Sequence, residues 1–458
     1  MTDLADRPAT EPDAALPPSR RPLVGVTSAL VAVLAWFVLI GNGGYVIGFV
    51  GFVIALLVSV CLHEAGHYLT ARRYGMKATQ FFVGFGPTLW SRQRGETEWG
   101  VKGIPLGGFV KIVGMTPLEQ VAPGDEPRAF YRAPVRQKVV VLAAGSTVHF
   151  ILATLLIVGG TFAIGAVREQ APAVGAVSEC IAPDRVGVTD IARDTDPCTL
   201  PGSVPAPALA AGLEAGDVVT AVDGVALSES RDLSTALRAA GSTPVTLTVD
   251  RDGDQRTVEV TPATIPRFPI TETTVDTDRL EPVGTIGVQI QPRIHTERLG
   301  PVASLEESRD LAVLQLQGIQ KVVTEKLGSI TKIYSADRDP EGFVGIVGVG
   351  RISGEVIESE ETAGVKALTF VGIVAGLNLF VGLFNLLPLL PLDGGHIAIA
   401  VYEGVRDRIR RLFGYRGQFQ RVDYNKLLPL TYAVAGVFLV FTVALLGADL
   451  FNPIRLPS

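Results

Sequence analysis

Long apolar runs divide the chain and predict its fold class. Each run is long enough for a helix that crosses about 30 Å of hydrocarbon. A tight turn is expected between the first two runs, at the sequence GNGG, although the first run could also form one region with the second. The pattern predicts an α-helical polytopic membrane protein. The runs cover residues 22–40, 45–70, 139–166, 365–390 and 427–447.

The segment between the second and third runs has a pattern typical of strands. The aromatic and β-branched residues of 81–115 are interrupted by glycine pairs and by the turn-like sequence RQRGE. This pattern predicts a β-hairpin or a small sheet. The segment is more apolar than an ordinary cytoplasmic loop, so we expect it to be membrane-associated. Irregular backbone in that position must be shielded by protein or line a wet cavity.

Polar segments flank and interrupt the apolar runs. Residues 1–21 are proline-rich and aperiodic, which is typical of a disordered tail. Residues 166–268 combine strand patterns with one amphipathic helix pattern and predict a compact α+β domain. Residues 269–364 predict a connector that contains an amphipathic helix. The membrane domain therefore has two parts, 22–165 and 365–450.

Composition and charge support a membrane protein and predict its orientation. Charged residues make up 19% of the chain, whereas soluble domains contain about 25%. Residues 166–364 hold 31 acidic and 17 basic residues, and the rest of the chain has an excess of basic ones. By the positive-inside rule, we expect a multi-pass plasma-membrane (inner-membrane) protein with a cytoplasmic tail and an extracytoplasmic α+β domain. Membrane lipids are then partners, and the overall acidity argues against nucleic acid.

The chain has three cysteines, of which two lie in the acidic block. Cys180 and Cys198 can form a disulfide if that block is translocated to an oxidising compartment. The alternative is a pair of unbonded small residues. Cys61 lies in an apolar run and is interpreted as a buried small residue.

The sequence HEAGH inside the second apolar run carries the candidate chemistry. His63 and His67 are four residues apart, so on a helix they lie on one face and can bind one Zn²⁺. Glu64 is then placed to act as a general base toward water activated by the metal. The alternative is a polar helix end at the membrane surface. Ionisable groups inside a membrane are costly and usually functional, which favours the zinc site.

A catalytic zinc usually has three protein ligands, and the candidate for the third is Asp393. It follows an apolar run in the sequence NLLPLLPLDGGHIA, and Gly394 and Gly395 allow its backbone to approach another element closely. An unpaired aspartate beside lipid costs roughly 2.5–3.5 kcal/mol, and binding a cation offsets that penalty. The alternative role is an N-cap of the following helix.

The order of these motifs resembles the site-2 protease family of intramembrane zinc metalloproteases (peptidase M50-like). The resemblance covers most of residues 46–450 and is strongest to bacterial members that cleave anti-sigma factors. It implies a PDZ-like domain at 166–268, zinc bound by His63, His67 and Asp393, and Glu64 as general base. The motifs are HEAGH, GFGP at 84–87, PLGGF at 105–109 and LDGG at 392–395.

The resemblance also implies residues that contact an extended substrate. Asn385, in the loop before Asp393, is the first candidate, and Asn378 is a second whose alternative role is an interhelical hydrogen bond. Gly84 and Gly86 of the GFGP motif complete the set. The sequence departs from the family pattern at His149, where an asparagine is common. That histidine either approaches the metal site or lies hydrogen-bonded at a helix interface.

The expected reaction is hydrolysis of a peptide bond in a transmembrane substrate. The resemblance implies single-span membrane regulators such as anti-sigma factors, which an upstream site-1 protease cleaves first. The PDZ-like domain either binds a C-terminus or acts as a size filter, and the sequence does not choose between them. The alternatives are a non-catalytic membrane scaffold, which would not need the base Glu64, and a zinc transporter, which would need repeated halves.

Overall fold

The computed structural model describes residues 43–115, 119–169, 171–184, 196–269, 279–335, 338, 342–415 and 422–454. The predicted tail at 1–21 and the predicted span at 22–40 lie outside the described residues. The chain divides into two compact units, and each is described by itself. The first comprises Met1–Phe162, Pro301–Glu360 and Lys366–Ser458, and the second comprises Ala163–Gly300 with Glu361–Val365.

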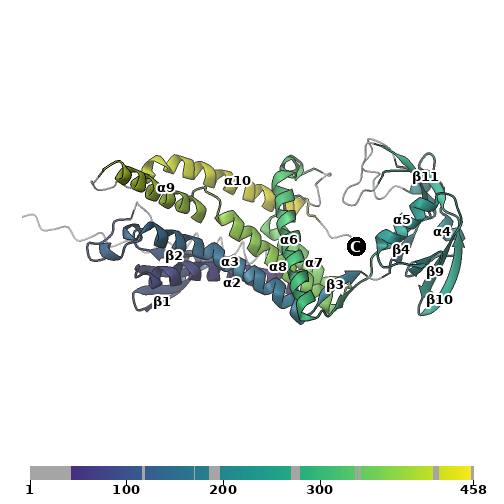
Figure 1. Ribbon diagram of the computed structural model, residues 1–458, viewed down its shortest axis with the longest axis horizontal. Helices are drawn as coiled ribbons and strands as arrows, with labels where there is room; N and C mark the ends of the chain where they lie inside the picture. Colours follow the sequence, from purple (N-terminus) through teal and green to yellow (C-terminus); the bar gives the residue numbers. More distant parts are fainter. Residues whose placement is uncertain are drawn as a thin grey trace, which may run out of the picture. The chain divides into compact units, whose positions relative to one another are not determined.

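Four described helices are long and apolar enough to cross a membrane. Their sequences are apolar on all sides, and each of them exposes large apolar side chains in the protein alone, as expected of helices that face lipid. The last four of the five predicted runs fall on these helices. The chain is therefore a polytopic membrane protein. The helices are α2 (Gly43–Arg73), α3 (Val135–Ala163), α8 (Ala363–Asn385) and α10 (Leu428–Phe451) (Figure 1).

Glycines bring α2 close to its neighbours. A Cβ atom on Gly66 would lie 2.8 Å from the backbone oxygen of Ala144 in α3. At the other end of α2, a Cβ on Gly48 would collide with the backbone of Ser353 in α7 (Ile346–Glu358). Helices in membranes pack through small residues because lipid supplies no hydrophobic force between them. These contacts fix the helix that carries the HEAGH sequence.

A small sheet follows α2, as the strand pattern predicts. Strands β1 (Ala78–Arg94) and β2 (Thr97–Ile112) are antiparallel, and Phe81 of β1 pairs with both Trp99 and Val110 of β2. The beginning of β1 therefore lies between two parts of β2. The Trp99 ring packs against Phe81 and Tyr68, and this contact joins the sheet to α2.

The first unit also contains helices outside the apolar runs. The helical pattern expected in the connector is α6, whose Ser308 hydroxyl lies 2.7 Å from the Thr161 hydroxyl of α3. The α6 side chain Gln315 donates a hydrogen bond to the carbonyl of Gly372 in α8. These elements are α6 (Pro301–Thr324), α9 (Asp393–Leu412) and the short helices η1 (Glu126–Arg128), η2 (Phe130–Arg132), η4 (Leu327–Lys332) and η5 (Tyr424–Lys426).

The second unit is built around a six-stranded sheet in the order β10-β9-β7-β4-β13, with β8 paired to β7. Leu233 and Leu237 of α5 are buried on a core that includes Leu247 and Val249 of β9. The elements are β3 (Ala166–Glu169), β4 (Ala173–Val177), β5 (Cys180–Ile181), η3 (Pro197–Thr199), β6 (Val204–Pro205), α4 (Pro207–Ala210), β7 (Val218–Val222), β8 (Val225–Ala226), α5 (Ser230–Ala240), β9 (Val245–Arg251), β10 (Asp254–Val260), β11 (Ala263–Arg267), β12 (Glu281–Thr285), β13 (Val288–Gln291) and β14 (Ile294–Glu297).

The compact unit extends beyond the range expected for the α+β domain, 166–268. Strand β13 forms one end of the six-stranded sheet by pairing with β4, and β14 pairs with β3. These partners are more than one hundred residues apart, so no local pattern reveals them. Cys180 and Cys198 form a disulfide, which is the first of the two alternatives predicted for these cysteines. It joins β5 to η3.

Candidate metal centre

The two histidines of the HEAGH sequence lie one turn apart in the C-terminal half of α2. Both are buried, with His63 7% exposed and His67 3% exposed. Their Nε2 atoms are 3.1 Å apart, because the i and i+4 positions share one face of a helix. Two imidazole nitrogens thus point to one place, as the spacing predicts.

Asp393 is brought to the same place by a loop and the start of α9. The preceding loop packs tightly on the two glycines that follow the aspartate. A Cβ on Gly394 would collide with the carbonyl oxygen of Leu387, and one on Gly395 would lie 2.6 Å from the nitrogen of Leu390. Only glycine fits at such contacts. The close packing directs the Asp393 carboxylate toward α2 from a position about 330 residues away in the sequence.

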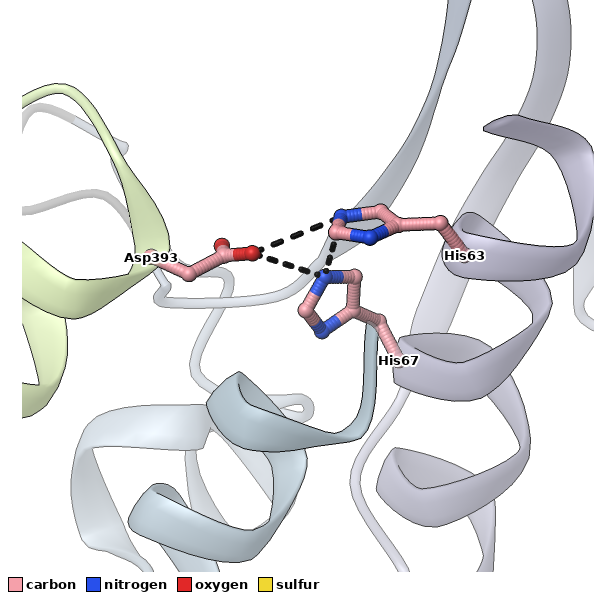
Figure 2. Close-up of side chains that lie close together, drawn as sticks. All are labelled: His63, His67 and Asp393. Carbon is pink, nitrogen blue, oxygen red and sulfur yellow. Dashed lines mark hydrogen bonds and ion pairs between the residues drawn. The ribbon is translucent and has the colours of Figure 1, made fainter. Parts of the chain in front are cut away.

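The three ligand atoms have the spacing of a tetrahedral zinc site. Asp393 Oδ2 lies 3.4 Å from His63 Nε2 and 3.3 Å from His67 Nε2. Zinc–nitrogen and zinc–oxygen distances near 2.05 Å place neighbouring tetrahedral ligands about 3.3 Å apart. Figure 2 shows the three side chains pointing at one another. Among the described residues, these are the histidine, cysteine and acidic side chains whose ligand atoms converge in this way. They fit Zn²⁺.

The second nitrogen of each histidine shows how the rings are held. His67 donates from Nδ1 to the carbonyl oxygen of Val141 in α3 at 2.7 Å. That hydrogen bond leaves Nε2 free for a metal, as ligand histidines usually require. The His63 ring lies against Gly145, where a Cβ would be 2.6 Å from two ring atoms. Both rings are therefore positioned by α3.

Glu64 lies beside the ligand cluster and against the sheet. Its Oε2 accepts a hydrogen bond of 3.0 Å from the backbone N–H of Val110 in β2. A Cβ on Gly108 would lie 3.5 Å from Cγ of Glu64, so this part of β2 lies directly beside the Glu64 side chain. A structural metal site needs no base next to it. A purely structural metal site would therefore leave the position of Glu64 unexplained.

The other predicted site residues lie in three different settings. Asn378 is 1% exposed and joins α8 to its neighbours through hydrogen bonds to His149 and Ser59, which is the interhelical role considered for it. Asn385 is the half-buried last residue of α8. Gly84 and Gly86 have φ of +86° and +81°, a conformation that glycine adopts readily, and they shape β1 opposite Ile104.

Three side chains that could hold zinc, an adjacent carboxylate and neighbouring apolar helices indicate the class of protein. These are the components of a zinc metalloprotease that works within a membrane. The profile of peptidase family M50 matches residues 51–417. The chain belongs to this family and is an intramembrane zinc metalloprotease.

Individual relatives agree with this assignment. The chain is 38% identical over 423 residues to the zinc metalloprotease Rip1 of Mycolicibacterium smegmatis, with 90% of this chain and 98% of the relative covered. It is 37% identical over 431 residues to Rip1 of Mycobacterium tuberculosis, with 90% and 99% covered. The metalloprotease MmpA of Caulobacter vibrioides is 28% identical over 414 residues, with 84% and 93% covered.

Several residues around the site have no strong signal in the sequence. Gly145 and Val141 contact the ligand histidines from α3, and Val110 contacts Glu64 from β2. Each contact depends on how distant segments cross. A weak signal exists at Gly145, because it lies four residues before His149 and so on the same helix face.

Proposed function

We propose that His63, His67 and Asp393 hold the zinc, that Glu64 is the general base, and that the substrates are single-span membrane regulators such as anti-sigma factors. The observation that carries the proposal is the convergence of three potential ligand atoms next to Glu64, on and beside a helix that is apolar enough to cross a membrane. An upstream site-1 protease would act first, as in the family that the sequence resembles. The bond to be cut would then lie within the membrane.

The residues of this chain supply proton transfer and positioning. Bound Zn²⁺ supplies Lewis acidity, which polarises a carbonyl and makes water acidic near neutral pH. Glu64 accepts the proton of the attacking water through one carboxylate oxygen, while Val110 holds the other by its N–H. Glu64 then delivers that proton to the leaving nitrogen. This role requires no covalent intermediate with the enzyme.

The outer edge of β2 is the proposed receptor for an unwound substrate. The N–H of Val110 points to Glu64, and therefore away from the β1 strand with which Val110 pairs. A transmembrane helix hides its peptide bonds in internal hydrogen bonds, so it must become extended before cleavage. Added as a strand at this edge, the extended segment would lie beside the general base. Asn385, Gly84 and Gly86 are proposed to help hold it.

The test is cleavage of a membrane-anchored anti-sigma-like substrate co-expressed with the wild type or with Glu64→Gln. Glutamine keeps the size of the side chain but does not accept the proton, so we expect the uncleaved substrate to accumulate. Zinc content should stay near one per chain, because Glu64 is not a ligand. Equal cleavage by both proteins would show that Glu64 is not the base.

We also infer that the second unit is an extracytoplasmic PDZ-like domain. Its disulfide is typical of oxidising compartments. Basic side chains at the C-terminal ends of α2 and α9 favour a cytoplasmic location for those ends. Within this unit, a cavity of 340 Å³ lies between α5 and β13. Its apolar lining includes Leu237 and Ile290, and Arg238 and Arg267 also line it.

We propose that this cavity binds a peptide C-terminus and is not a pure size filter, because Arg238 offers a guanidinium group to a terminal carboxylate, whereas Arg267 is already paired with Asp184. The test compares binding of an apolar C-terminal peptide with that of its amidated form, using the full-length protein in detergent. Stronger binding of the free acid would support recognition of a C-terminus. Equal or absent binding of the two peptides would leave the size filter as the role of the unit.

A further inference from the structure

His149 is part of a buried hydrogen-bond network that joins three helices behind the metal centre. The side chain is 2% exposed, and its Nδ1 lies 2.8 Å from Oδ1 of Asn378 in α8. Asn378 donates from Nδ2 to the hydroxyl of Ser59 in α2 at 3.1 Å and to the carbonyl of Val374 at 2.8 Å. The network thus connects α3, α8 and α2 in the part of the protein where the zinc ligands lie.

The contacts of Asn378 determine which nitrogen of His149 carries the proton. The carbonyl of Val374 can only accept, so the amide NH₂ must face it and the amide oxygen must face His149. Because that oxygen also only accepts, the proton of His149 lies on Nδ1. In the neutral ring, Nε2 then carries a lone pair and is an acceptor. The hydrogen bond to Asn378 therefore leaves Nε2 of His149 as a buried acceptor.

His63 is the nearby group that needs an acceptor. Its Nε2 points to Asp393 and His67, so Nδ1 carries the proton when Nε2 binds a metal. Nδ1 is buried and has no hydrogen-bond partner among the described residues. His67 differs, because its Nδ1 donates to Val141. Metal-binding histidines almost always donate their second N–H to an acceptor, so the site lacks one contact.

The rings of His63 and His149 are close enough to supply that contact. Their centroids are 4.9 Å apart and the planes are tilted by 41°. Gly145, which lies one helical turn before His149 on the same face of α3, also packs against the His63 ring. His149 does not belong to the group of converging ligand atoms. His149 is therefore placed to contact the proposed metal ligand His63, and is not itself placed as a ligand.

We propose that His149 is a positioning residue for the metal centre. Its Nε2 accepts the Nδ1–H of His63, directly or through one water, and holds that ring in the orientation that zinc binding requires. Asn378 keeps His149 in the tautomer that can accept. This inference rests on the proposed role of His63 as a zinc ligand.

The first test measures zinc affinity of the full-length protein in detergent by competition with a chromophoric chelator. His149→Phe keeps a ring of similar shape and removes the acceptor, so we expect zinc binding to weaken about 10–100-fold. Asn378→Leu should weaken it by a smaller factor, because His149 stays but its tautomer is no longer fixed. Unfolding of both metal-free variants is measured in parallel. Zinc affinity equal to that of the wild type in His149→Phe would overturn the proposal, whatever its stability.

A second measurement reports the tautomer directly. In ¹⁵N-histidine-labelled protein, NMR should show His149 neutral with the proton on Nδ1, and Asn378→Leu should change that pattern. A proton on Nε2 in the wild type would overturn the proposal. His63→Ala separates this inference from the proposed function: if zinc is retained without His63, the ligand assignment itself fails. If zinc is lost in His63→Ala and unaffected in His149→Phe, only the role of His149 fails.

Discussion

Gly145→Ala is the substitution that most directly tests how the ligand helix is held. Gly145 lies in α3 against the His63 ring, and an added Cβ would be 2.6 Å from the ring atoms Nδ1 and Nε2. Carbon and nitrogen atoms in contact need about 3.5 Å, so the ring must move by about 1 Å. The His149 ring, one helical turn further along α3, lies with its centroid 4.9 Å from that of His63, so a shift of the His63 ring also changes this contact.

The magnitude follows from the tolerance of metal sites. Ligand distances in zinc sites vary by about 0.2 Å, which is much less than the required shift. Disturbing the surroundings of a ligand typically weakens metal binding by about 10–100-fold, or about 1.4–2.7 kcal/mol. Overpacking of the α2–α3 contact adds about 1–3 kcal/mol of destabilisation. Alanine recovers part of this cost, about 1 kcal/mol, through its higher helix propensity.

The matched control is Gly159→Ala in the same helix. A Cβ at Gly159 would have no atom within 4 Å, so the two substitutions share the propensity gain and differ in the collision. The assay is chelator competition for zinc on the purified full-length protein, with cleavage of a transmembrane substrate as a second readout. We expect Gly145→Ala to bind zinc about 10–100-fold more weakly and to cleave less substrate, and Gly159→Ala to match the wild type in both measurements. Wild-type zinc affinity in Gly145→Ala would refute the packing argument.

Three further predictions concern other charged groups. Asp393→Ala should reduce bound zinc to well below one per chain by elemental analysis, and unchanged stoichiometry would remove Asp393 from the ligand set. Asp449→Asn should destabilise α10 by about 3–5 kcal/mol in detergent unfolding, because it leaves the 5%-exposed Arg338 without its carboxylate. In the second unit, burial alone would raise the pKa of Asp217, but its hydrogen bonds from Arg251 hold the pKa below the usual value. Hydrogen exchange of this unit should therefore show full stability above pH about 4 and a loss as the pH falls through the lowered pKa, whereas Asp217→Asn should remove that pH dependence.

The site was predictable from the sequence where its geometry is local. His63 and His67 share a helix, and a spacing of four residues places both on one face whatever surrounds them. Asp393 could be found because its two glycines mark a close approach of the backbone. The four described apolar helices were predictable for a similar reason, since membrane thickness determines the length of each run.

The contacts that complete the site could not be predicted, because they depend on how distant segments pack. Nothing near Glu64 in the sequence indicates that Val110 would donate to it, since the register of β1 and β2 decides that contact. The second unit shows the same limit. Its sheet is completed by β13, whose partner β4 lies more than one hundred residues earlier. Periodicity describes each strand but not the partner it pairs with.

Glycine at the helix contacts explains how a metal site is built where the hydrophobic effect does not drive helices together. Helices in lipid associate through close packing, and small residues permit the closest approach. Gly66 brings α2 against α3 one residue before His67, and Gly145 receives the His63 ring from the other helix. Gly394 allows the loop to fold onto the start of α9 immediately after Asp393. Each of the three proposed ligands therefore either lies next to a glycine in the sequence or has its ring packed against one. Substitution at these glycines should impair zinc binding before it unfolds the helices, because the bound metal depends on tenths of an ångström and the helices do not.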